Sequence, residues 1–452
     1  MNIIIAILIF SVIIVIHELG HFLLAKKNGI FVTEFSVGMG PRLISLVKTE
    51  EGYRPRFLLS QHEFEHNPVW KDTTKYSIKL LPIGGSCMMM GEDELVEDDR
   101  AFNKKGVWAR ISVVVAGPLF NFILAFLLAM IIVAATGYDP AKVTQVVSDS
   151  PAAEAGILPG DVLTELNGRN INIAREALTY LQMYPLTNGE VSLTFARDGK
   201  EYKTTLTPQL YKKYLLGFNY PTEGGEAVIL EVAEDMPLEK AGLKPGDIIV
   251  DINGHDIANR DALAAYFQEY PLTDEEVTIT YSREGAEATV NVTPALYSEG
   301  YSMGFGLNGA QEKTDFFGVI KYSAVEVKYW IVTTIESIGL LVGGKVSAND
   351  MAGPVGIVSM IGDTYQASKS AGILNVFINM AAISILLSAN LGVMNLLPIP
   401  ALDGGRLVFL LLEVFRGKPI DQAKEGMVHM IGLIALMLLM VFVMFNDLSR
   451  IF

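Results

Sequence analysis

The chain has 452 residues, too many for one ordinary domain, and half of them are hydrophobic. Its formal net charge is −15 at pH 7, so it lacks the basic balance that a nucleic-acid partner would require. The single cysteine, Cys87, excludes an intrachain disulfide and is most simply a small buried hydrophobic residue.

The first element is an apolar stretch from Met1 to Ala25 that contains the motif His17-Glu18-Leu19-Gly20-His21. About 20 apolar residues suffice to cross a bilayer, and ionisable groups inside such a span are costly and usually functional. On a helix, residues four apart share one face, so His17 and His21 can direct ring nitrogens at one metal ion. Zinc accepts imidazole well, and Glu18 can take a proton from a zinc-bound water.

Two other interpretations of this stretch are weaker. A signal peptide would carry a basic n-region and a clear A-x-A cleavage site, and neither is present. The histidines could instead be structural and pair with other helices, but the spacing and Glu18 favour metal binding.

A second HExxH sequence, His62-Glu63-Phe64-Glu65-His66, lies in a polar stretch. Pro68 disfavours helix at Asn67, and no apolar periodicity surrounds the motif. We predict a solvated loop here rather than a metal site. The flanking segments Phe31–Ile44 and Tyr76–Met90 are apolar, punctuated by glycine and strand-like, which predicts a small re-entrant β-layer.

Four segments are long and apolar enough to span a membrane, namely 2–25, 111–136, 373–397 and 427–445. The segment 316–343 is also apolar, but four charged residues interrupt it, which favours an amphipathic helix on the membrane over a fifth span.

Basic residues near the span ends set the orientation. They fall on one side of the four spans: Lys26, Lys27, Lys104, Lys105, Arg110, Arg406, Arg416, Lys418 and Lys424. That side is then the cytoplasm, and the N-terminus and segment 137–372 are outside. This segment holds 17 basic and 32 acidic residues, so it carries the net charge of the whole chain.

Residues 151–297 contain a duplication with a constant offset of 86 residues. Ala155-Gly156-Ile157-Leu158-Pro159-Gly160-Asp161 is repeated as Ala241-Gly242-Leu243-Lys244-Pro245-Gly246-Asp247. Each copy has short alternating runs that predict strands, such as Val162–Leu166 and Ile248–Ile252, and one helix, near 173–183 and 259–269. Each copy resembles a PDZ domain of the kind attached to bacterial proteases. Such modules bind extended peptides by strand addition, and the alternative is a spacer that filters access to the membrane site.

The first and third spans cross in the same direction, so the sequence from Asn395 to Gly405 lies at the same leaflet as His17 and His21. Asp403 is the only acidic residue between Asp363 and Glu413. A carboxylate is the expected third ligand of a two-histidine zinc site. An aspartate in a turn is the alternative, and spacing alone does not decide between them.

Together these motifs resemble the site-2 protease family of intramembrane zinc metalloproteases, in its bacterial regulator-of-sigma-E form. The likeness covers nearly the whole chain and also rests on Phe35-Ser36-Val37-Gly38-Met39-Gly40, Pro82-Ile83-Gly84-Gly85, Ala101-Phe102-Asn103, Ala116-Gly117-Pro118 with Asn121, and Gly353-Pro354-Val355. The methionine-rich Ser86–Met90 departs from the family.

The resemblance implies Zn²⁺ held by His17, His21 and Asp403, with Glu18 as the catalytic residue. It also leads us to assign a second set of residues to substrate binding: Asn395, Gly38, Gly40, Pro398 and Pro400. The β-layer would offer an edge to an unwound substrate.

We therefore expect an α-helical membrane protein with four transmembrane helices, a small re-entrant β-layer and two tandem extracytoplasmic PDZ-like α+β domains. The expected boundaries are 1–28 (first span), 29–107 (cytoplasmic-side β region), 108–137 (second span), 138–218 and 219–305 (PDZ-like domains), 306–371 (amphipathic membrane-surface segment), 372–398 (third span), 399–425 (loop with Asp403) and 426–446 (fourth span).

The expected function is intramembrane cleavage of single-pass membrane proteins, of the anti-sigma-factor type or remnant signal peptides, near the cytoplasmic leaflet of the bacterial inner membrane. The expected partners are these substrates, membrane lipid and extended peptides at the PDZ-like domains. One alternative is a PDZ-bearing scaffold with a structural zinc, which would need a fourth protein ligand, and only Cys87 is a candidate. A metal transporter would carry more intramembrane ligands, but the only other histidine in a span is His429.

Overall fold

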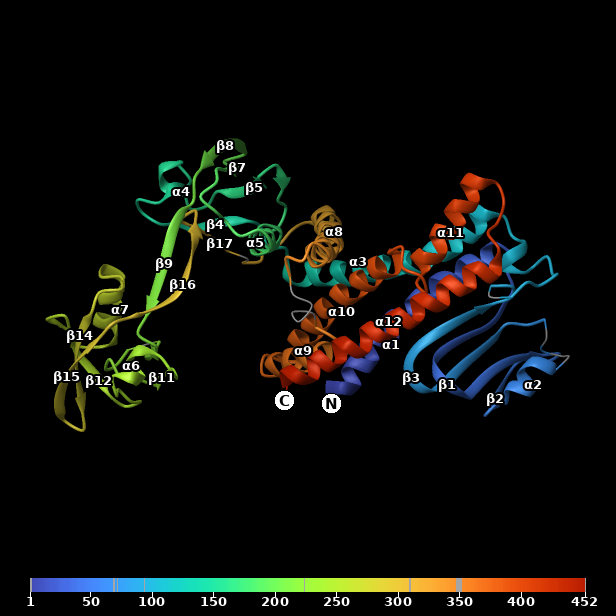
Figure 1. Cartoon of the computed structure of the whole chain (residues 1–452), viewed down its shortest axis with the longest axis horizontal. Helices are drawn as coiled ribbons and strands as arrows, with labels where there is room; N and C mark the ends of the chain where they lie inside the picture. Colours follow the sequence, from blue (N-terminus) through green and yellow to red (C-terminus); the bar gives the residue numbers. More distant parts are fainter. Residues whose placement is uncertain are drawn as a thin grey trace. The chain divides into compact units, whose positions relative to one another are not determined.

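The computed structural model describes residues 2–451 apart from 68–69, 71, 93, 223, 309 and 347–351. The chain forms two compact units (Figure 1). One comprises Met1–Asp139 with Ala310–Phe452, and the other comprises Pro140–Gly309.

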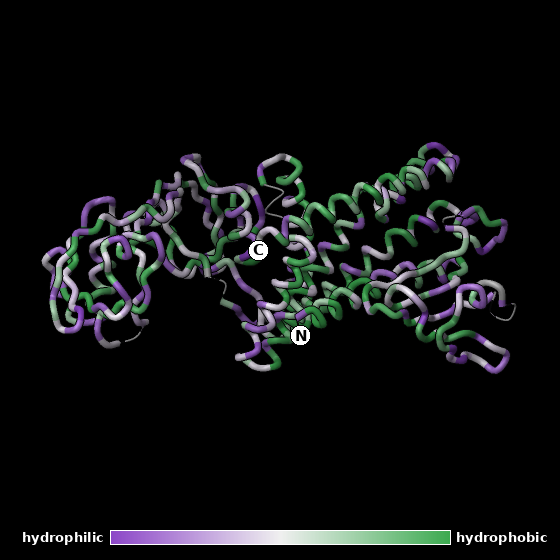
Figure 2. The backbone as a smooth tube through the Cα atoms, turned by 60° about the horizontal axis from the view of Figure 1, so that its bottom comes forward, coloured by the Kyte–Doolittle hydropathy of each residue, from purple (hydrophilic) through white to green (hydrophobic). Residues whose placement is uncertain are grey.

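Four helices of the first unit are long and apolar enough to cross a membrane, and they lie where the four spans were predicted. They are α1 (Asn2–Lys27), α3 (Val107–Thr136), α10 (Ile373–Leu396) and α12 (Gln422–Ile451). Figure 2 shows hydrophobic residues running along these helices. Glycine brings two of them into backbone contact, because a Cβ at Gly20 of α1 would lie 2.3 Å from the carbonyl oxygen of Ala116 in α3.

Helices α8 (Phe316–Val342), α9 (Pro354–Lys369) and α11 (Asp403–Arg416) also belong to this unit. The expected membrane-surface segment 306–371 thus contains two helices, while its residues 309 and 347–351 lie outside the described ones. Helix α8 is not among the four candidate spans. It packs Val327 and Trp330 against Ala125 and Ala129 of α3 and against Ile385 of α10.

The two predicted strand segments correspond to β1 (Val32–Thr49) and β3 (Lys75–Met89), which form a sheet with β2 (Gly52–Phe57) in the order β2-β1-β3. Phe35 pairs with both Tyr76 and Cys87, so the two halves of β3 flank the first part of β1. The second half of β3 lies against α1, where the Ser11 hydroxyl donates to the carbonyl of Pro82. The sheet therefore presents this half of β3 to the helix that carries the HExxH motif.

The second HExxH corrects one prediction, because His62 lies in a short helix, α2 (Gln61–His66), and not in a loop. Ser60 caps this helix by accepting a hydrogen bond from the backbone N–H of Glu63. The helix ends before Asn67, whose extended backbone fits the residue before a proline. Pro68 therefore correctly predicted an extended Asn67, whereas the helix before it depends on the Ser60 cap, which the prediction did not consider.

A 3₁₀ turn, η1 (Phe102–Lys104), follows the sheet.

The second unit contains both repeat copies. The first copy is built from β4 (Lys142–Val146), α4 (Pro151–Glu154), β5 (Val162–Leu166), β6 (Arg169–Asn170), α5 (Ala174–Met183), β7 (Val191–Arg197) and β8 (Lys200–Leu206). The second contains β10 (Phe218–Asn219), β11 (Glu231–Val232), α6 (Pro237–Lys240), β12 (Ile248–Ile252), β13 (His255–Asp256), α7 (Arg260–Glu269), β14 (Val277–Arg283) and β15 (Ala286–Val292). Strands β5 and β12 and helices α5 and α7 lie where the repeat predicts them.

The copies are nested rather than tandem. Strand β17 (Phe305–Asn308), which follows the second copy, pairs with β4 of the first. The core of the first copy accordingly includes Met303, whereas that of the second runs from Leu216 to Val292. An antiparallel ribbon of β9 (Gln209–Leu215) and β16 (Ala295–Ser302) connects them. The expected domains 138–218 and 219–305 therefore do not coincide with the two hydrophobic cores, because the first core also includes Met303 from beyond the second copy.

The AGxxPGD motif has a structural role in both copies. Asp161 is buried and accepts two hydrogen bonds from Arg197, at 2.6 and 2.7 Å, and a third from the backbone N–H of Leu158. Asp247 and Arg283 repeat this arrangement at 2.7 and 2.7 Å. The arginine hydrogen bonds hold the pKa of each aspartate below its usual range.

Candidate metal centre

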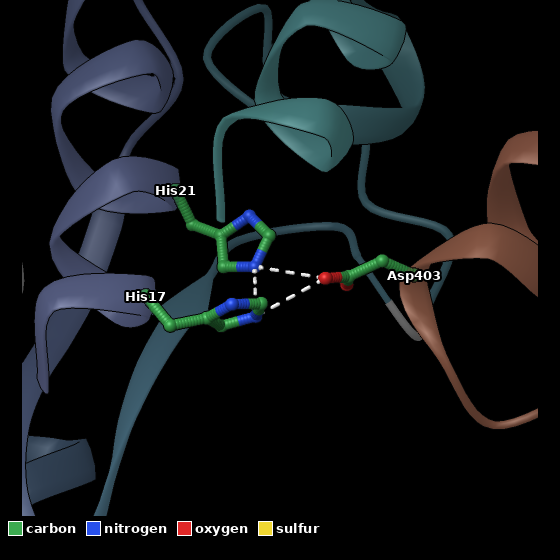
Figure 3. Close-up of side chains that lie close together, drawn as sticks. All are labelled: His17, His21 and Asp403. Carbon is green, nitrogen blue, oxygen red and sulfur yellow. Dashed lines mark hydrogen bonds and ion pairs between the residues drawn. The ribbon is translucent and has the colours of Figure 1, made fainter. Parts of the chain in front are cut away.

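Both histidines of the first HExxH motif lie on one face of α1 and are buried. Their Nε2 atoms are 3.1 Å apart. The Oδ2 atom of Asp403 lies 3.1 Å from Nε2 of His17 and 3.5 Å from Nε2 of His21 (Figure 3). Asp403 follows His21 by 382 positions in the sequence. The three predicted metal ligands nevertheless converge on one point.

The glycines after Asp403 explain how the carboxylate reaches this point. Asp403 is the first residue of α11, directly after the loop that follows α10. A Cβ at Gly404 would lie 2.1 Å from the carbonyl oxygen of Leu397, and a Cβ at Gly405 would lie 2.4 Å from that of Ile399. Only glycine allows α11 to begin in contact with the loop behind it, and this contact directs Asp403 towards α1.

Helix α3 holds the other sides of both imidazoles. The backbone carbonyl of Val113 lies 2.8 Å from Nδ1 of His21 and is positioned to accept a hydrogen bond from Nδ1–H. The side-chain amide of Asn121 lies 3.1 Å from Nδ1 of His17, and the Asn121 Oδ1 atom makes no hydrogen bond within the described part of the chain. With the amide turned so that Oδ1 faces the ring, it accepts from Nδ1–H. Both Nε2 atoms are then free to bind a metal, as is usual for metal-binding histidines.

The distances fit zinc. Four-coordinate zinc with bonds of about 2.0–2.1 Å places neighbouring ligand atoms about 3.3 Å apart, and the three separations here are 3.1, 3.1 and 3.5 Å. The Oδ2 atom of Asp403 is buried and makes no hydrogen bond among the described residues. Burial acts to raise the pKa of Asp403, but the two imidazoles outweigh it and hold that pKa well below its usual range, so the carboxylate is available as a ligand.

Comparison of the sequence with known proteins identifies the family of the chain. The model of peptidase family M50 matches residues 5–61 and 62–439. The zinc metalloprotease RasP of Bacillus licheniformis is 32% identical over 100% of both chains, and RasP of Geobacillus kaustophilus is 31% identical over 99% of this chain and 97% of its own. The chain belongs to peptidase family M50.

Two further matches are more distant. The regulator of sigma-W protease RasP of Bacillus subtilis is 29% identical over 99% of this chain and 98% of its own. Among solved structures, the PDZ domain of HtrA3 bound to a phage-derived ligand matches 20% of this chain and 93% of its own, with a TM-score of 0.17 and 19% identity.

Membership of this family makes the protein a zinc metalloprotease. A structural zinc would need a fourth protein ligand, and Cys87 was the only candidate. Within the described residues, the group of potential ligands consists of His17, His21 and Asp403 alone. The Cys87 side chain packs against the cluster around Ala25 and Val32, and burial raises the pKa of its thiol. Three protein ligands with a fourth position for water are typical of catalytic zinc.

Glu18 lies between the two histidines and next to β3. A Cβ at Gly85 would lie 3.4 Å from Cγ of Glu18. The side chain of the predicted catalytic residue therefore contacts the half of β3 that faces α1.

The structure distributes the predicted substrate-binding residues over two places. Gly38 and Gly40 lie in β1 with φ of +87° and +89°, and a Cβ at Gly38 would lie 2.4 Å from the carbonyl oxygen of Leu81 in β3. Asn395 is half-buried in the last turn of α10, and Pro398 and Pro400 belong to the loop before Asp403.

Sequence reasoning assigned no role to three features of α3: Val113, Gly117 and Asn121. A Cβ at Gly117 would lie 2.3 Å from Nε2 of His21 and 2.7 Å from Cε1 of His17. The family motif had included Gly117 and Asn121, but only their positions show that they contact the ligands. A backbone carbonyl such as that of Val113 leaves no signal in a sequence. In the second HExxH motif, His62 is exposed and is not in the group of potential ligands, and the side chain of His66 is outside the described ones.

Proposed function

We propose that this protein is an intramembrane endopeptidase that cuts single-pass membrane proteins near the cytoplasmic leaflet, in regulated intramembrane proteolysis. The observation that supports it is the convergence of His17, His21 and Asp403 on one point in the unit that holds the four apolar helices. Substrates of the anti-sigma-factor type or remnant signal peptides fit this site, because both present a single apolar segment.

The chemistry follows from the residues around the site. When bound, zinc would polarise the scissile carbonyl and lower the pKa of a water in its open position. His17 and His21 keep their Nε2 atoms directed at the point where the metal would bind, because Asn121 and Val113 fix their Nδ1 sides. Glu18 accepts the proton of the attacking water and then delivers it to the leaving amine.

A substrate helix must unwind before cleavage, because its amides are hydrogen-bonded internally in lipid. We assign the second half of β3 as the surface that receives the unwound segment. Among the described strands, β3 pairs only with β1, and its Leu80, Leu81 and Ile83 side chains are exposed. An extended substrate added at this edge would lie next to Glu18. Gly38 and Gly40 shape the strand behind it, while Asn395, Pro398 and Pro400 delimit the site at the end of α10.

The decisive experiment measures zinc content and cleavage on the same purified proteins, with a model single-pass substrate in proteoliposomes. We expect Glu18→Gln to keep its zinc and to lose cleavage by a factor of about 10² or more. Asp403→Ala and His21→Ala should lose both, whereas His62→Ala, in the other HExxH motif, should behave as wild type. Wild-type cleavage by Glu18→Gln, or full zinc content in Asp403→Ala, would contradict the assignment.

We also propose that the protein lies in the bacterial inner membrane with its N-terminus and second unit outside, since the basic residues near the spans fall on the other side. In a Cys87→Ser background, a cysteine placed at Ser298 should react with an impermeant maleimide in intact spheroplasts. A cysteine at Lys418 should react only after lysis. The reverse pattern would refute the orientation.

The nested PDZ-like copies would admit substrates already trimmed outside the membrane. They would do so either by binding an extended peptide or by excluding substrates that still carry a large folded domain. A substrate with a folded outer domain should be cut more slowly than its trimmed form. Removing residues 216–292, the core of the second copy, should reduce this difference, and an unchanged difference would exclude that copy from selection.

A further inference from the structure

Helix α12 contributes none of the three ligands, yet it contacts the loop that carries Asp403 at two positions. Nδ1 of His429 accepts a hydrogen bond of 2.8 Å from the backbone N–H of Ala401. Three residues later, on the same face, a Cβ at Gly432 would lie 2.4 Å from Cβ of Pro400 and 2.6 Å from its carbonyl oxygen. The fourth span therefore touches the backbone just before Asp403.

Ala401 needs such a contact. Its φ is +76°, in the left-handed region that residues with a Cβ rarely adopt. A backbone hydrogen bond offsets the cost of this conformation, and it also fixes the orientation of the peptide that leads through Leu402 into Asp403. The loop conformation and the direction of the carboxylate are thus coupled to His429.

The His429 ring is itself held on two sides. Its centroid lies 5.6 Å from that of Phe409 in α11, and its Nε2 atom lies 3.9 Å from the carboxylate of Glu425, one turn earlier on α12. The ring is not part of the group of potential metal ligands in the described chain. Its Nδ1 atom acts as a hydrogen-bond acceptor for the loop backbone.

We propose that His429 is a positioning residue, which fixes the left-handed turn at Ala401 and so directs Asp403 to the point where the two imidazoles meet. This inference rests on the proposed role of Asp403 as a ligand. The fourth span would then help to assemble the metal site in two ways. His429 Nδ1 accepts the hydrogen bond from Ala401, and Gly432 allows α12 to lie close to Pro400.

Two substitutions separate the acceptor from the bulk of the ring. Asparagine can present Oδ1 close to the position of Nδ1 and keeps the acceptor, whereas phenylalanine keeps the ring and removes it. Met430→Leu, at an exposed neighbouring position of α12, serves as the control.

The test measures zinc affinity of the purified full-length protein by competition with a chelator, and hydrogen exchange of residues 398–403 in the metal-free protein. We expect His429→Phe to weaken zinc binding roughly fivefold and to speed exchange in the loop by a similar factor, the effect of losing one neutral hydrogen bond. His429→Asn and Met430→Leu should match wild type in both measurements. Wild-type affinity and exchange in His429→Phe would overturn the proposal, as would an equal defect in His429→Asn.

A second pair of variants keeps the test decisive if His429→Phe folds poorly. Glycine adopts φ of +76° without strain, so Ala401→Gly should restore much of the zinc affinity lost in His429→Phe. Failure of this rescue would count against the coupling. Asp403→Ala, in the same assay, separates the role of Asp403 as a ligand from the role of His429 as a positioning residue. Unchanged zinc affinity in Asp403→Ala would overturn the metal site. Hydrogen exchange of the loop would still show whether His429 fixes its conformation.

Discussion

Replacing Gly117 with alanine introduces one methyl group at the closest contact between α3 and the metal ligands. The new Cβ would lie 2.3 Å from Nε2 and 2.6 Å from Cε1 of His21, and 2.7 Å from Cε1 of His17. Carbon and nitrogen atoms that are not bonded pack at about 3.5 Å or more, so the His21 ring must move by about 1 Å. Zinc sites tolerate deviations of only about 0.2 Å in ligand distance.

The cost of this displacement can be set against the gain in helix propensity. Overpacking costs about 1–3 kcal/mol, whereas alanine is favoured over glycine in a helix by about 1 kcal/mol. In the metal-free protein the rings can turn aside and relieve the overpacking, so the stability of Gly117→Ala should stay within about 1 kcal/mol of wild type. With zinc the rings must return, and the affinity should fall by a factor of about 5–150, the equivalent of the overpacking cost.

The assay compares thermal unfolding in detergent with and without zinc, because the stabilisation that a ligand gives the folded state grows with the logarithm of its affinity. Gly117→Ala should unfold close to the wild-type temperature without zinc and gain much less when zinc is added. Gly339→Ala in α8 is the matched control, since a Cβ there meets no atom within 4 Å. An undiminished zinc-dependent increase in unfolding temperature for Gly117→Ala would refute the proposed contact between α3 and the ligands.

Three further predictions follow from other contacts. Because arginine hydrogen bonds lower the pKa of Asp161 and Asp247 in the folded state, the stability they contribute is complete above the unfolded pKa of about 3.9 and is lost as the pH falls through the lower folded value. Their asparagine variants should flatten the acid limb of the unfolding curve, and an unaltered limb would count against the pairing. Asn121→Leu should reduce zinc affinity by about 10–100-fold, the usual effect of removing the hydrogen-bond partner of a metal-bound histidine, while Asn121→Asp should retain it; equal zinc content in both would show that His17 needs no such partner. Gly432→Ala should weaken zinc binding although alanine favours the helix by about 1 kcal/mol, and a more stable variant with unchanged affinity would exclude the contact with the loop.

The structure brings the three predicted ligands together, and the sequence signal is local for two of them. The spacing of His17 and His21 follows from helix geometry alone. Asp403 could not be decided in the same way, since a D-G pair is equally typical of a turn. In the structure it begins α11, and what distinguishes it is the contact of Gly404 and Gly405 with the preceding loop, which spacing does not reveal.

The nested arrangement of the repeat copies could not be predicted from their period. The two copies align without a gap over residues 151–297, so the sequence predicts two equal modules in succession. The strand that completes the first copy, Phe305–Asn308, lies after the second one and pairs with Lys142–Val146. The sequence pattern does not reveal which copy a strand completes. A strand that follows the second copy but pairs with the first has the same hydrophobic alternation as one that pairs within its own copy, because it buries one face in either case.

The metal site also depends on how closely membrane helices approach each other. Lipid offers no hydrophobic force to drive helices together, so close packing must come from small residues that let backbones touch. Gly20 provides this contact only one residue before His21, at a position where any Cβ would meet the carbonyl oxygen of Ala116. The same approach brings Val113 within 2.8 Å of Nδ1 of His21. A larger residue at position 20 would separate α1 from α3 and remove the hydrogen-bond partners of both imidazoles together, so the glycine inside the HExxH motif is part of the proposed metal site even though it offers no ligand atom.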